Sequence, residues 1–255
     1  MTLRLLFSLL IALTSHGTLA ADPEPLMAVR GKVLFADDFK GTALGPKWKG
    51  GKLGEWTVNN GVLACNAHSG DSHDPYLYLL AEFEFKDVVV EFGFKFEQSS
   101  EIDLCVRDTN SKEYAQGSHV LRSTVRPNLA QVVDLREGVM KWENYRIRKD
   151  PKAAPEQQKA LAEKLRDRSG NFKAEFDKDA WHQVRVEIVG EEILMSVDGK
   201  PLAYLQSTGI GHPKKNQIGF SCGKSASFKP LTMWAVTANP AWVAKRDALV
   251  RSLSK

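Results

Sequence analysis

The stretch EFEFKDVVVEFGFKFEQ, residues 82–98, decides the fold of this chain. Its apolar residues follow a period of two on either side of a Lys-Asp pair: Phe83, Phe85, Val88, Val90, Phe92, Phe94 and Phe96. Such alternation is typical of strands that bury one face and leave the other to solvent. The stretch therefore predicts two adjacent half-buried strands.

The same alternation continues further along the chain. EIDLCVRD, residues 101–108, predicts another strand, and HQVRVEIVGEEILMSVDGKPLAYL, residues 182–205, predicts three more. The last two of these meet at Asp198–Gly199, a tight hairpin turn, because both residues accept positive φ. NQIGFSCG and PLTMWAVTAN add two strands near the end. Short strands separated by turns predict an all-β sandwich of antiparallel sheets.

Two segments have a helical pattern instead. PEQQKALAEKLRDRSG begins with a proline, continues with strong helix formers and ends at Gly170, which predicts a helix inserted at residues 155–169. Residues 239–255 begin with an Asn-Pro cap and place Trp242 on an apolar face. We therefore expect one domain over residues 33–238, followed by a C-terminal amphipathic helix. That helix either packs on the sandwich or, with the inserted helix, contacts a protein partner.

The N-terminus has the layout of a secretory signal. Residues 1–20 contain one basic residue, Arg4, then an apolar run and small residues before a cleavage site after Ala20 or Ala21. The apolar run is too short to span a bilayer comfortably. We expect a mature chain that is secreted, periplasmic or in the cell envelope, without a membrane span. With 43% hydrophobic and 26% charged residues, the composition is that of an ordinary globular protein.

Charge and cysteine content exclude several functions. The formal net charge is +4, and the excess lies in residues 145–170, where eight basic residues interleave with four acidic ones. A solvated helix face explains that pattern, so nucleic-acid binding is not expected. There is no Cys-x-x-Cys pair. The three cysteines, Cys65, Cys105 and Cys222, allow one disulfide and one free thiol, with Cys65–Cys222 as a candidate pair.

The order of these segments resembles a known family. LFADDF, then EWTVNNGVLAC, DVVVEFGFKF, IDLCVR, WHQVRVEIVGEEILMSVDGK and NQIGFSC are similar to the 3-keto-disaccharide hydrolase domains of exported bacterial proteins, within the concanavalin A-like lectin and glucanase superfamily. The resemblance spans about residues 34–236. It implies a concanavalin-like jelly roll whose concave face holds a saccharide, and hydrolysis of a modified (3-keto) glycoside. The alternative is a non-catalytic carbohydrate-binding or protein-interaction module of the cell envelope.

The EIDLCVRD strand carries the first candidate site residues. If Ile102 and its alternating neighbours face the core, then Glu101, Asp103 and Arg107 project to the opposite face. Two carboxylates about 6–7 Å apart suit glycoside hydrolysis, with Arg107 binding the substrate. Family-16 glycoside hydrolases use a similar strand with a third acid, which here falls at Cys105 or Val106. Their retaining mechanism is therefore not expected, and a surface ion-pair network is the alternative explanation.

Four more residues complete the predicted site. His119 is a candidate general base and Arg122 a substrate clamp, although residues three apart point to opposite faces of a regular strand. Both therefore line one groove only if His119 precedes the strand proper; a hydrogen-bonded strand-end histidine is the alternative. Gln131 is a candidate substrate-binding residue. Trp142 either stacks on a sugar ring or pins the inserted segment to the core.

Metal sites receive only weak support from the sequence. The loop of residues 66–76 contains His68, Asp71, His73 and Asp74, but its Ser, Gly and Pro content suits an ordinary turn, and no metal-ligand set is predicted. The acidic pair Asp37–Asp38, joined by carbonyls of the last strand, would suit a structural calcium ion.

Overall fold

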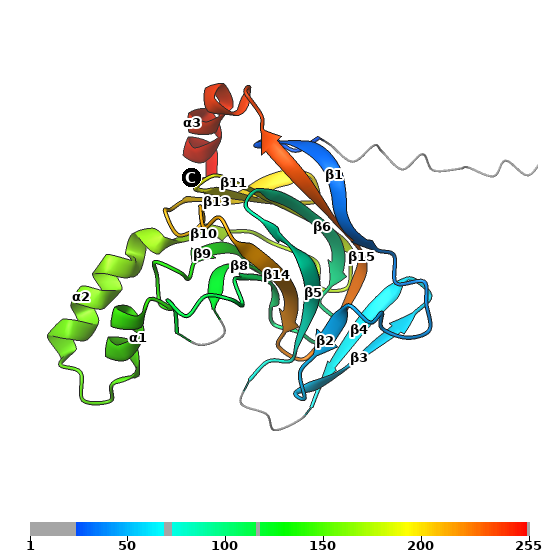
Figure 1. Ribbon diagram of the computed structural model, residues 1–255, viewed down its shortest axis with the longest axis horizontal. Helices are drawn as coiled ribbons and strands as arrows, with labels where there is room; N and C mark the ends of the chain where they lie inside the picture. The colour runs from blue at the N-terminus through cyan, green and yellow to red at the C-terminus, as the bar shows by residue number, and fades with distance from the viewer. Residues whose placement is uncertain (1–23, 69–72, 116–117, 254–255) are drawn as a thin grey trace, which may run out of the picture.

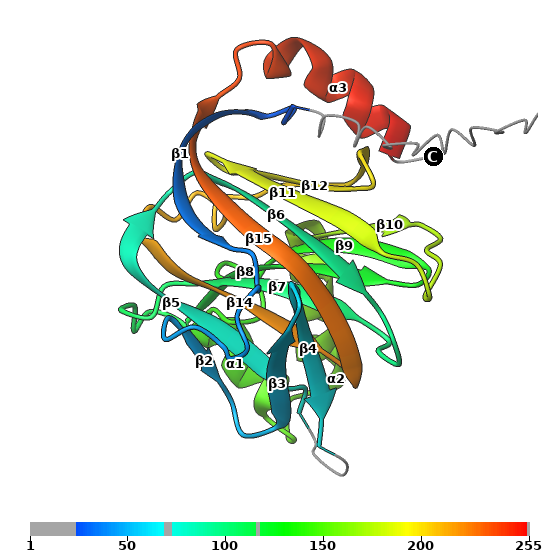
Figure 2. The ribbon, with the colours of Figure 1, turned by 90° about the vertical axis from the view of Figure 1, so that its right-hand side faces the viewer.

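The computed structural model describes residues 24–68, 73–115 and 118–253, so the expected signal segment and Asp71 lie outside the described residues. The described strands form two antiparallel sheets packed face to face (Figures 1 and 2). The predicted all-β sandwich is confirmed.

The first sheet has eight strands in the order β13-β12-β11-β6-β15-β4-β3, and β1 also pairs with β15. Its strands are β1 (Ala28–Asp37), β3 (Gly54–Asn59), β4 (Val62–Ala67), β6 (Val88–Lys95), β11 (His182–Val189), β12 (Glu192–Val197), β13 (Lys200–Gln206) and β15 (Ser225–Ala238). The start of β15 pairs with β4, and its second half pairs with β1. The strand β1 thus begins at Ala28, five residues before the expected domain start at residue 33.

The second sheet has seven strands in the order β10-β9-β8-β7-β14-β5-β2. Its strands are β2 (Trp48–Gly50), β5 (Tyr76–Phe85), β7 (Ile102–Arg107), β8 (His119–Arg126), β9 (Leu129–Asp134), β10 (Ser169–Lys173) and β14 (Lys215–Cys222). This sheet carries the candidate site described below.

The stretch of residues 82–98 spans both sheets. It contributes the end of β5 to the seven-stranded sheet and all of β6 to the eight-stranded sheet, with Lys86 and Asp87 as the crossing. The two strands are consecutive in the chain but do not pair, because the alternation shows which side chains face the core and not which sheet a strand joins. β6 is also buried on its outer side, where Glu91 pairs with Arg30 and Arg185.

The meander β11–β12–β13 has the three strands and the hairpin turn that the sequence predicts. Asp198 and Gly199 form its second turn with φ of 51° and 75°, as the Asp-Gly pair predicts. Between the two sheets, Phe220 stacks on Phe228 with ring centroids 4.5 Å apart and meets Phe92 at 4.9 Å. These contacts join the inner faces of both sheets, because Phe220 belongs to one sheet and the other two rings belong to the opposite one.

Cysteines also meet in the core. Cys65 on β4 and Cys222 on β14 are buried free thiols from opposite sheets. Their side chains share a hydrogen bond, which together with burial raises the pKa of the Cys222 thiol. The third cysteine, Cys105, is a buried free thiol on β7.

The insertion between β9 and β10 is a helical hairpin of α1 (Trp142–Lys149) and α2 (Pro155–Leu165), rather than one helix (Figure 1). The helix starts at Pro155 as expected but ends at Leu165, followed by a 3-10 turn over Arg166–Arg168. Gly170 is not a helix stop. Gly170 lies in β10, where it pairs with Val132 of β9. The helix therefore ends ahead of Gly170, because the chain from Ser169 onward pairs as a strand.

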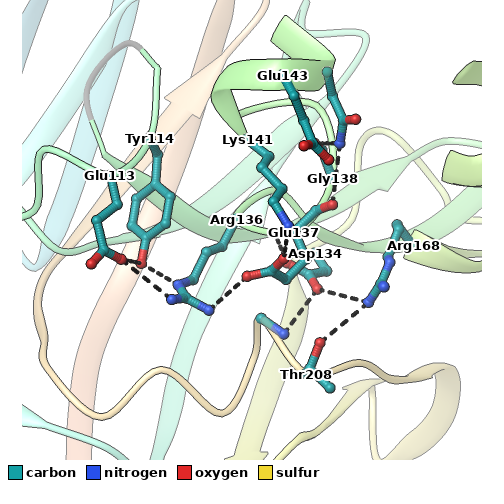
Figure 3. A network of polar contacts seen from close by, with 12 residues as sticks. Glu113, Tyr114, Asp134, Arg136, Glu137, Gly138, Lys141, Glu143, Arg168 and Thr208 are labelled. Carbon is teal, nitrogen blue, oxygen red and sulfur yellow. Dashed lines mark hydrogen bonds and ion pairs between the residues drawn. The ribbon is translucent and has the colours of Figure 1, made fainter.

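A buried carboxylate anchors this hairpin to the sandwich. Asp134, at the end of β9, accepts hydrogen bonds from the backbone N–H groups of Glu137 and Gly209 at 3.0 and 3.1 Å and from the hydroxyl of Ser207 at 2.5 Å. The Arg168 guanidinium lies 3.7 Å away (Figure 3). Asp134 therefore ties both ends of the inserted segment to the loop after β13.

The C-terminal helix α3 (Trp242–Leu253) lies on the outer face of the eight-stranded sheet (Figure 2). Trp242 is buried in one apolar cluster with Val89 and Leu194, and its indole N–H donates to Glu192 at 3.2 Å. Of the two expected roles for this apolar face, packing on the sandwich is the one observed. Within the described residues, no helix is long and apolar enough to cross a membrane.

Candidate functional site

The site is built on the outer face of the seven-stranded sheet. On β7, Ile102, Leu104 and Val106 are part of the core, so the intervening side chains point away from it. Neighbouring strands alternate in the same way, with Leu77 and Leu79 of β5 and Ile218 and Phe220 of β14 in the core. Polar and aromatic side chains from five strands therefore share one outer face.

This face contains a cavity of about 450 Å³. The side chains that define its chemistry are Lys49, Tyr76, Tyr78, Arg107, His119 and Gln217. Two of them, Arg107 and His119, are predicted site residues. The other four were missed, although the period-two run Tyr-Leu-Tyr-Leu at residues 76–79 is a signal that places both tyrosines on the face opposite the core.

A β-bulge explains how His119 and Arg122 reach the same face. In the β7–β8 ladder, Val106 pairs with Leu121 but Arg107 pairs with His119, so Val120 is an extra residue. Both Val120 and Leu121 are buried in the core. His119 is the first residue of β8 and lies on the outer face with Arg107, which is the arrangement that a regular strand would have prevented.

The floor of the cavity is a tyrosine held flat on the sheet. A Cβ on Gly219 would lie 2.2 Å from the Tyr78 ring, so only glycine leaves room for it. Arg107 stacks on the same ring, 4.4 Å from its centroid, and donates a hydrogen bond to the Gln217 side chain at 2.5 Å. Tyr76 packs against Tyr78 with a centroid distance of 4.7 Å and remains 37% exposed. Tyr76 is thus the ring available to a ligand.

The predicted carboxylates form a separate cluster on the same face. Asp103 accepts a hydrogen bond from the Thr124 hydroxyl and forms an ion pair with Arg122 at 3.5 Å. Glu101 forms an ion pair with Arg126 at 2.8 Å. Asp74, which the sequence placed in a weak metal loop, shares a hydrogen bond with Glu101. Asp103 is only 3% exposed and does not line the cavity, contrary to the expectation that all the strand's polar side chains emerge into one hollow.

Burial shifts the protonation of this cluster and of its neighbours. Desolvation raises the pKa of Asp103 to about 6, against the opposing effects of Arg122 and Thr124. Desolvation and the nearby Glu101 raise the pKa of Asp74. Burial, with the positive charges of Arg107 and Arg122, lowers the pKa of His119 to about 4. At neutral pH, His119 is therefore an uncharged donor and acceptor, and burial keeps Cys105 a thiol with a pKa of about 12.

Two predicted residues lie away from the cavity. Gln131 on β9 donates to Asn171 of β10, near the opposite edge of the sheet. Trp142 begins α1, where its indole N–H donates to the Lys112 carbonyl at 3.2 Å. It lies beside Tyr145 on the helical hairpin and does not line the cavity. The strand pattern predicts neither position, because Gln131 depends on the place of β9 in the sheet order and Trp142 depends on the inserted segment.

The described residues do not form the metal sites considered from the sequence. Within the part of the chain that the structure describes, no three His, Cys, Asp or Glu side chains are arranged so that they could hold a metal ion. Asp37 accepts the backbone N–H of Phe39 at 2.9 Å and the indole N–H of Trp48 at 2.8 Å, and Asp38 pairs with Lys40. These contacts stabilise the chain around the end of β1, and the calcium ion expected from the sequence stays a prediction.

No protein-family model matches the chain, and no curated protein matches it in sequence. Solved structures do match it in fold. A laminarinase from Flavobacterium sp. UMI-01 has a TM-score of 0.51 and 10% identity, covering 80% of this chain and all of that one. The catalytic domain of an endo-1,3-β-glucanase from Thermotoga petrophila RKU-1 has a TM-score of 0.53 and 10% identity, covering 82% and 99%.

A third solved structure with the same fold has no stated activity. It is a Bacillus subtilis protein of unknown function with a galectin-like fold, with a TM-score of 0.51 and 12% identity, covering 84% of this chain and all of that one. At such identities the likeness concerns the fold alone. The chain is a concanavalin-like jelly-roll sandwich of two antiparallel sheets, with an inserted helical hairpin and a C-terminal helix.

Proposed function

We propose that this protein binds a saccharide on the outer face of its seven-stranded sheet. The observation that carries the proposal is the cavity of about 450 Å³ in which the exposed ring of Tyr76 meets hydrogen-bonding groups of Gln217 and His119. Aromatic rings stack on the apolar faces of sugars, and a few fixed polar groups give orientation. Two structures that share the fold are named as a laminarinase and an endo-1,3-β-glucanase, which supports the same ligand class.

Binding is tested on the full chain with a panel of immobilised glycans, followed by calorimetry. Tyr76→Ala is expected to weaken the binding of any captured glycan by about tenfold or more, because stacking on the exposed ring is lost. Trp181→Ala is the matched control, since Trp181 is equally exposed at 37% but precedes β11 of the other sheet. Absence of glycan binding, or equal losses in both variants, would contradict the proposal.

Hydrolysis is a second candidate function, favoured by the carboxyl cluster. Asp103 retains its proton up to a pH of about 6 beside Glu101, and such pairs of unlike carboxyl groups divide acid and base roles. The resemblance of the sequence suggests a 3-keto glycoside as substrate, and His119 remains a candidate base. Against this, Asp103 is covered by its neighbours, so binding is the better supported function.

Turnover is tested with plain and 3-keto disaccharides, each with and without a chelator. A hydrolase that uses this cluster should lose activity by at least about a hundredfold in Glu101→Gln and Asp103→Asn. Full activity in both variants would remove these residues from the mechanism. Sugar binding without turnover would leave a carbohydrate-binding module. The expected signal at residues 1–20 leads us to propose that either function is exercised outside the cytoplasm.

A further inference from the structure

The cavity beside Tyr76 adjoins a second hollow on the same outer face. This hollow has a volume of about 270 Å³ and shares Leu80, Thr109 and Gln217 with the first cavity. Its other lining residues are Pro46, Lys47, Glu82 and Asn216. Because three residues line both hollows, the two form one groove, of which the saccharide site proposed above is only the first part.

Strand β5 runs along this groove. Tyr76, Tyr78 and Leu80 are alternate residues of β5 and line the groove. Leu77 and Leu79, which lie between them, belong to the core. At about 3.3 Å per residue, the backbone advances about 13 Å from Tyr76 to Leu80. The second hollow extends the groove further along β5, so the groove is longer than a disaccharide.

The groove offers apolar surface at two points along the strand. The Tyr76 ring is 37% exposed in the first cavity, and the Leu80 side chain is 42% exposed where the two hollows meet. Burying apolar surface against the face of a sugar ring stabilises binding at both points. Two such surfaces on one strand suit different units of one glycan chain.

An oriented amide group lies where the two hollows meet. Gln217 is only 7% exposed, and its side-chain oxygen accepts a hydrogen bond from Arg107 at 2.5 Å. A guanidinium can only donate, so this bond turns the amide NH₂ group away from Arg107. Within the described residues that NH₂ group donates no hydrogen bond, although Gln217 lines both hollows. An unpaired buried donor costs free energy, which favours a ligand oxygen at this point.

Asn216 repeats this arrangement in the second hollow. Its side-chain oxygen accepts hydrogen bonds from the backbone N–H and the hydroxyl of Thr109, at 2.9 and 3.2 Å. A backbone N–H can only donate, so the NH₂ group of Asn216 is oriented as well. It donates no hydrogen bond in the part of the chain that the structure describes. Hydroxyl, ring and glycosidic oxygens of a sugar chain are acceptors that match both amide groups.

We infer that the ligand is a linear oligosaccharide longer than a disaccharide, which lies along β5 and fills both hollows. The inference rests on the proposed function and specifies its ligand class. Tyr76 stacks on one sugar unit, Gln217 donates to the chain at the centre of the groove, and Asn216 donates to it in the second hollow. Affinity therefore rises with chain length until both hollows are filled.

Oligosaccharides of increasing length test this inference by calorimetry on the full chain. The probes are the cello- and manno-oligosaccharides from disaccharide to hexasaccharide, together with the same lengths cut from any polysaccharide that the glycan panel captures. In at least one series, the tetrasaccharide should bind about tenfold more tightly than the disaccharide, because it adds hydrogen bonds and apolar contacts in the second hollow.

Variants assign the length dependence to the second hollow. Asn216→Asp keeps an oxygen for Thr109 but removes the amide donor, so the advantage of the tetrasaccharide over the disaccharide should shrink from about tenfold to about twofold or less. Asn171→Asp is the control and should keep the full advantage, since it adds the same charge at an exposed position on β10, the edge strand at the other end of the sheet. Tyr76→Ala should weaken the binding of both lengths. Circular dichroism shows whether each variant is folded.

The inference and the proposed function fail differently. If oligosaccharides bind but the tetrasaccharide gains nothing over the disaccharide, or keeps its gain in Asn216→Asp, the extended site along β5 is wrong while saccharide binding stands. If no oligosaccharide binds and the glycan panel captures nothing, the proposed function itself is wrong.

Discussion

Arg107 and His119 face each other across the β7–β8 ladder because Val120 bulges out of the pairing between the strands. The bulge turns the His119 side chain to the same outer face as Arg107, although the spacing from Arg122 would otherwise send it into the core. The position of the one predicted histidine in the site is thus decided by a single extra residue.

This juxtaposition predicts how His119 titrates. Burial, with Arg107 and Arg122, lowers its pKa to about 4, so Arg107→Gln should raise that pKa measurably toward 6.5. Arg126→Gln, on the same strand but paired with Glu101, should leave it unchanged. Because protonation then favours the unfolded chain, the stability contributed by His119 falls as pH falls from about 6.5 to 4. NMR titration of the imidazole protons measures each pKa, and a wild-type value near 6.5 would contradict the buried position.

The raised pKa of Asp103 predicts that its contribution to stability changes with pH in the direction opposite to that of His119. The pKa of Asp103 rises from 3.8 to about 6 through burial, so the folded chain holds the proton more tightly than the unfolded chain does. The stabilisation that the protonated Asp103 contributes is fully present below about pH 4 and is lost as the pH rises to about 6. The free energy of unfolding should fall by about 2–3 kcal/mol over this range. Asp103→Asn should remove this slope in urea unfolding between pH 4 and 8, because its amide does not titrate over that range.

Two further variants test the cause of the Asp103 slope. Thr124→Val removes the hydroxyl that donates to the carboxylate, so it should raise the pKa of Asp103 further and move the slope to higher pH. Asp38→Asn changes an exposed carboxylate and should leave the slope in place. An identical pH profile for Asp103→Asn and the unaltered chain would show that Asp103 titrates normally.

The Asp134 anchor predicts a large loss of stability. Asp134→Ala leaves two backbone N–H groups and the Ser207 hydroxyl without their acceptor in a buried position. The free energy of unfolding should fall by about 2–4 kcal/mol in a denaturant titration. Glu113→Ala, at the exposed edge of the same network, should cost less than about 0.5 kcal/mol (Figure 3). Similar losses in the two variants would mean that Asp134 is not the anchor.

Cys65 and Cys222 predict a disulfide between the two sheets under oxidising conditions, since their thiols already share a hydrogen bond. Thiol titration in denaturant should then find one reactive thiol, and three after reduction, consistent with the three cysteines of the chain. The bond should raise stability by about 2–4 kcal/mol. Cys105→Ala should abolish the remaining reactive thiol and leave the bond intact, whereas three reactive thiols after oxidation would contradict the pairing.

The site shows where prediction from the sequence succeeds and where it stops. Alternation along EIDLCVRD correctly separates Ile102, Leu104 and Val106 from the polar side chains between them, because the two faces of a strand differ in burial. The same alternation says nothing about how far those polar side chains are covered. Arg122 and Thr124 come from a neighbouring strand and bury Asp103, so a residue expected in the open hollow is enclosed.

Side-chain periodicity and local backbone preferences were enough to predict the two-sheet antiparallel sandwich, the Asp198–Gly199 turn and the start of the helix at Pro155. The order of the strands within each sheet follows from the folded structure alone. It joined Lys49, Tyr78 and Arg107, which are far apart in the chain, in one cavity and left Gln131 and Trp142 outside it. Strand neighbours depend on the packing of the whole core, to which every strand contributes. No single segment of the sequence therefore predicts them.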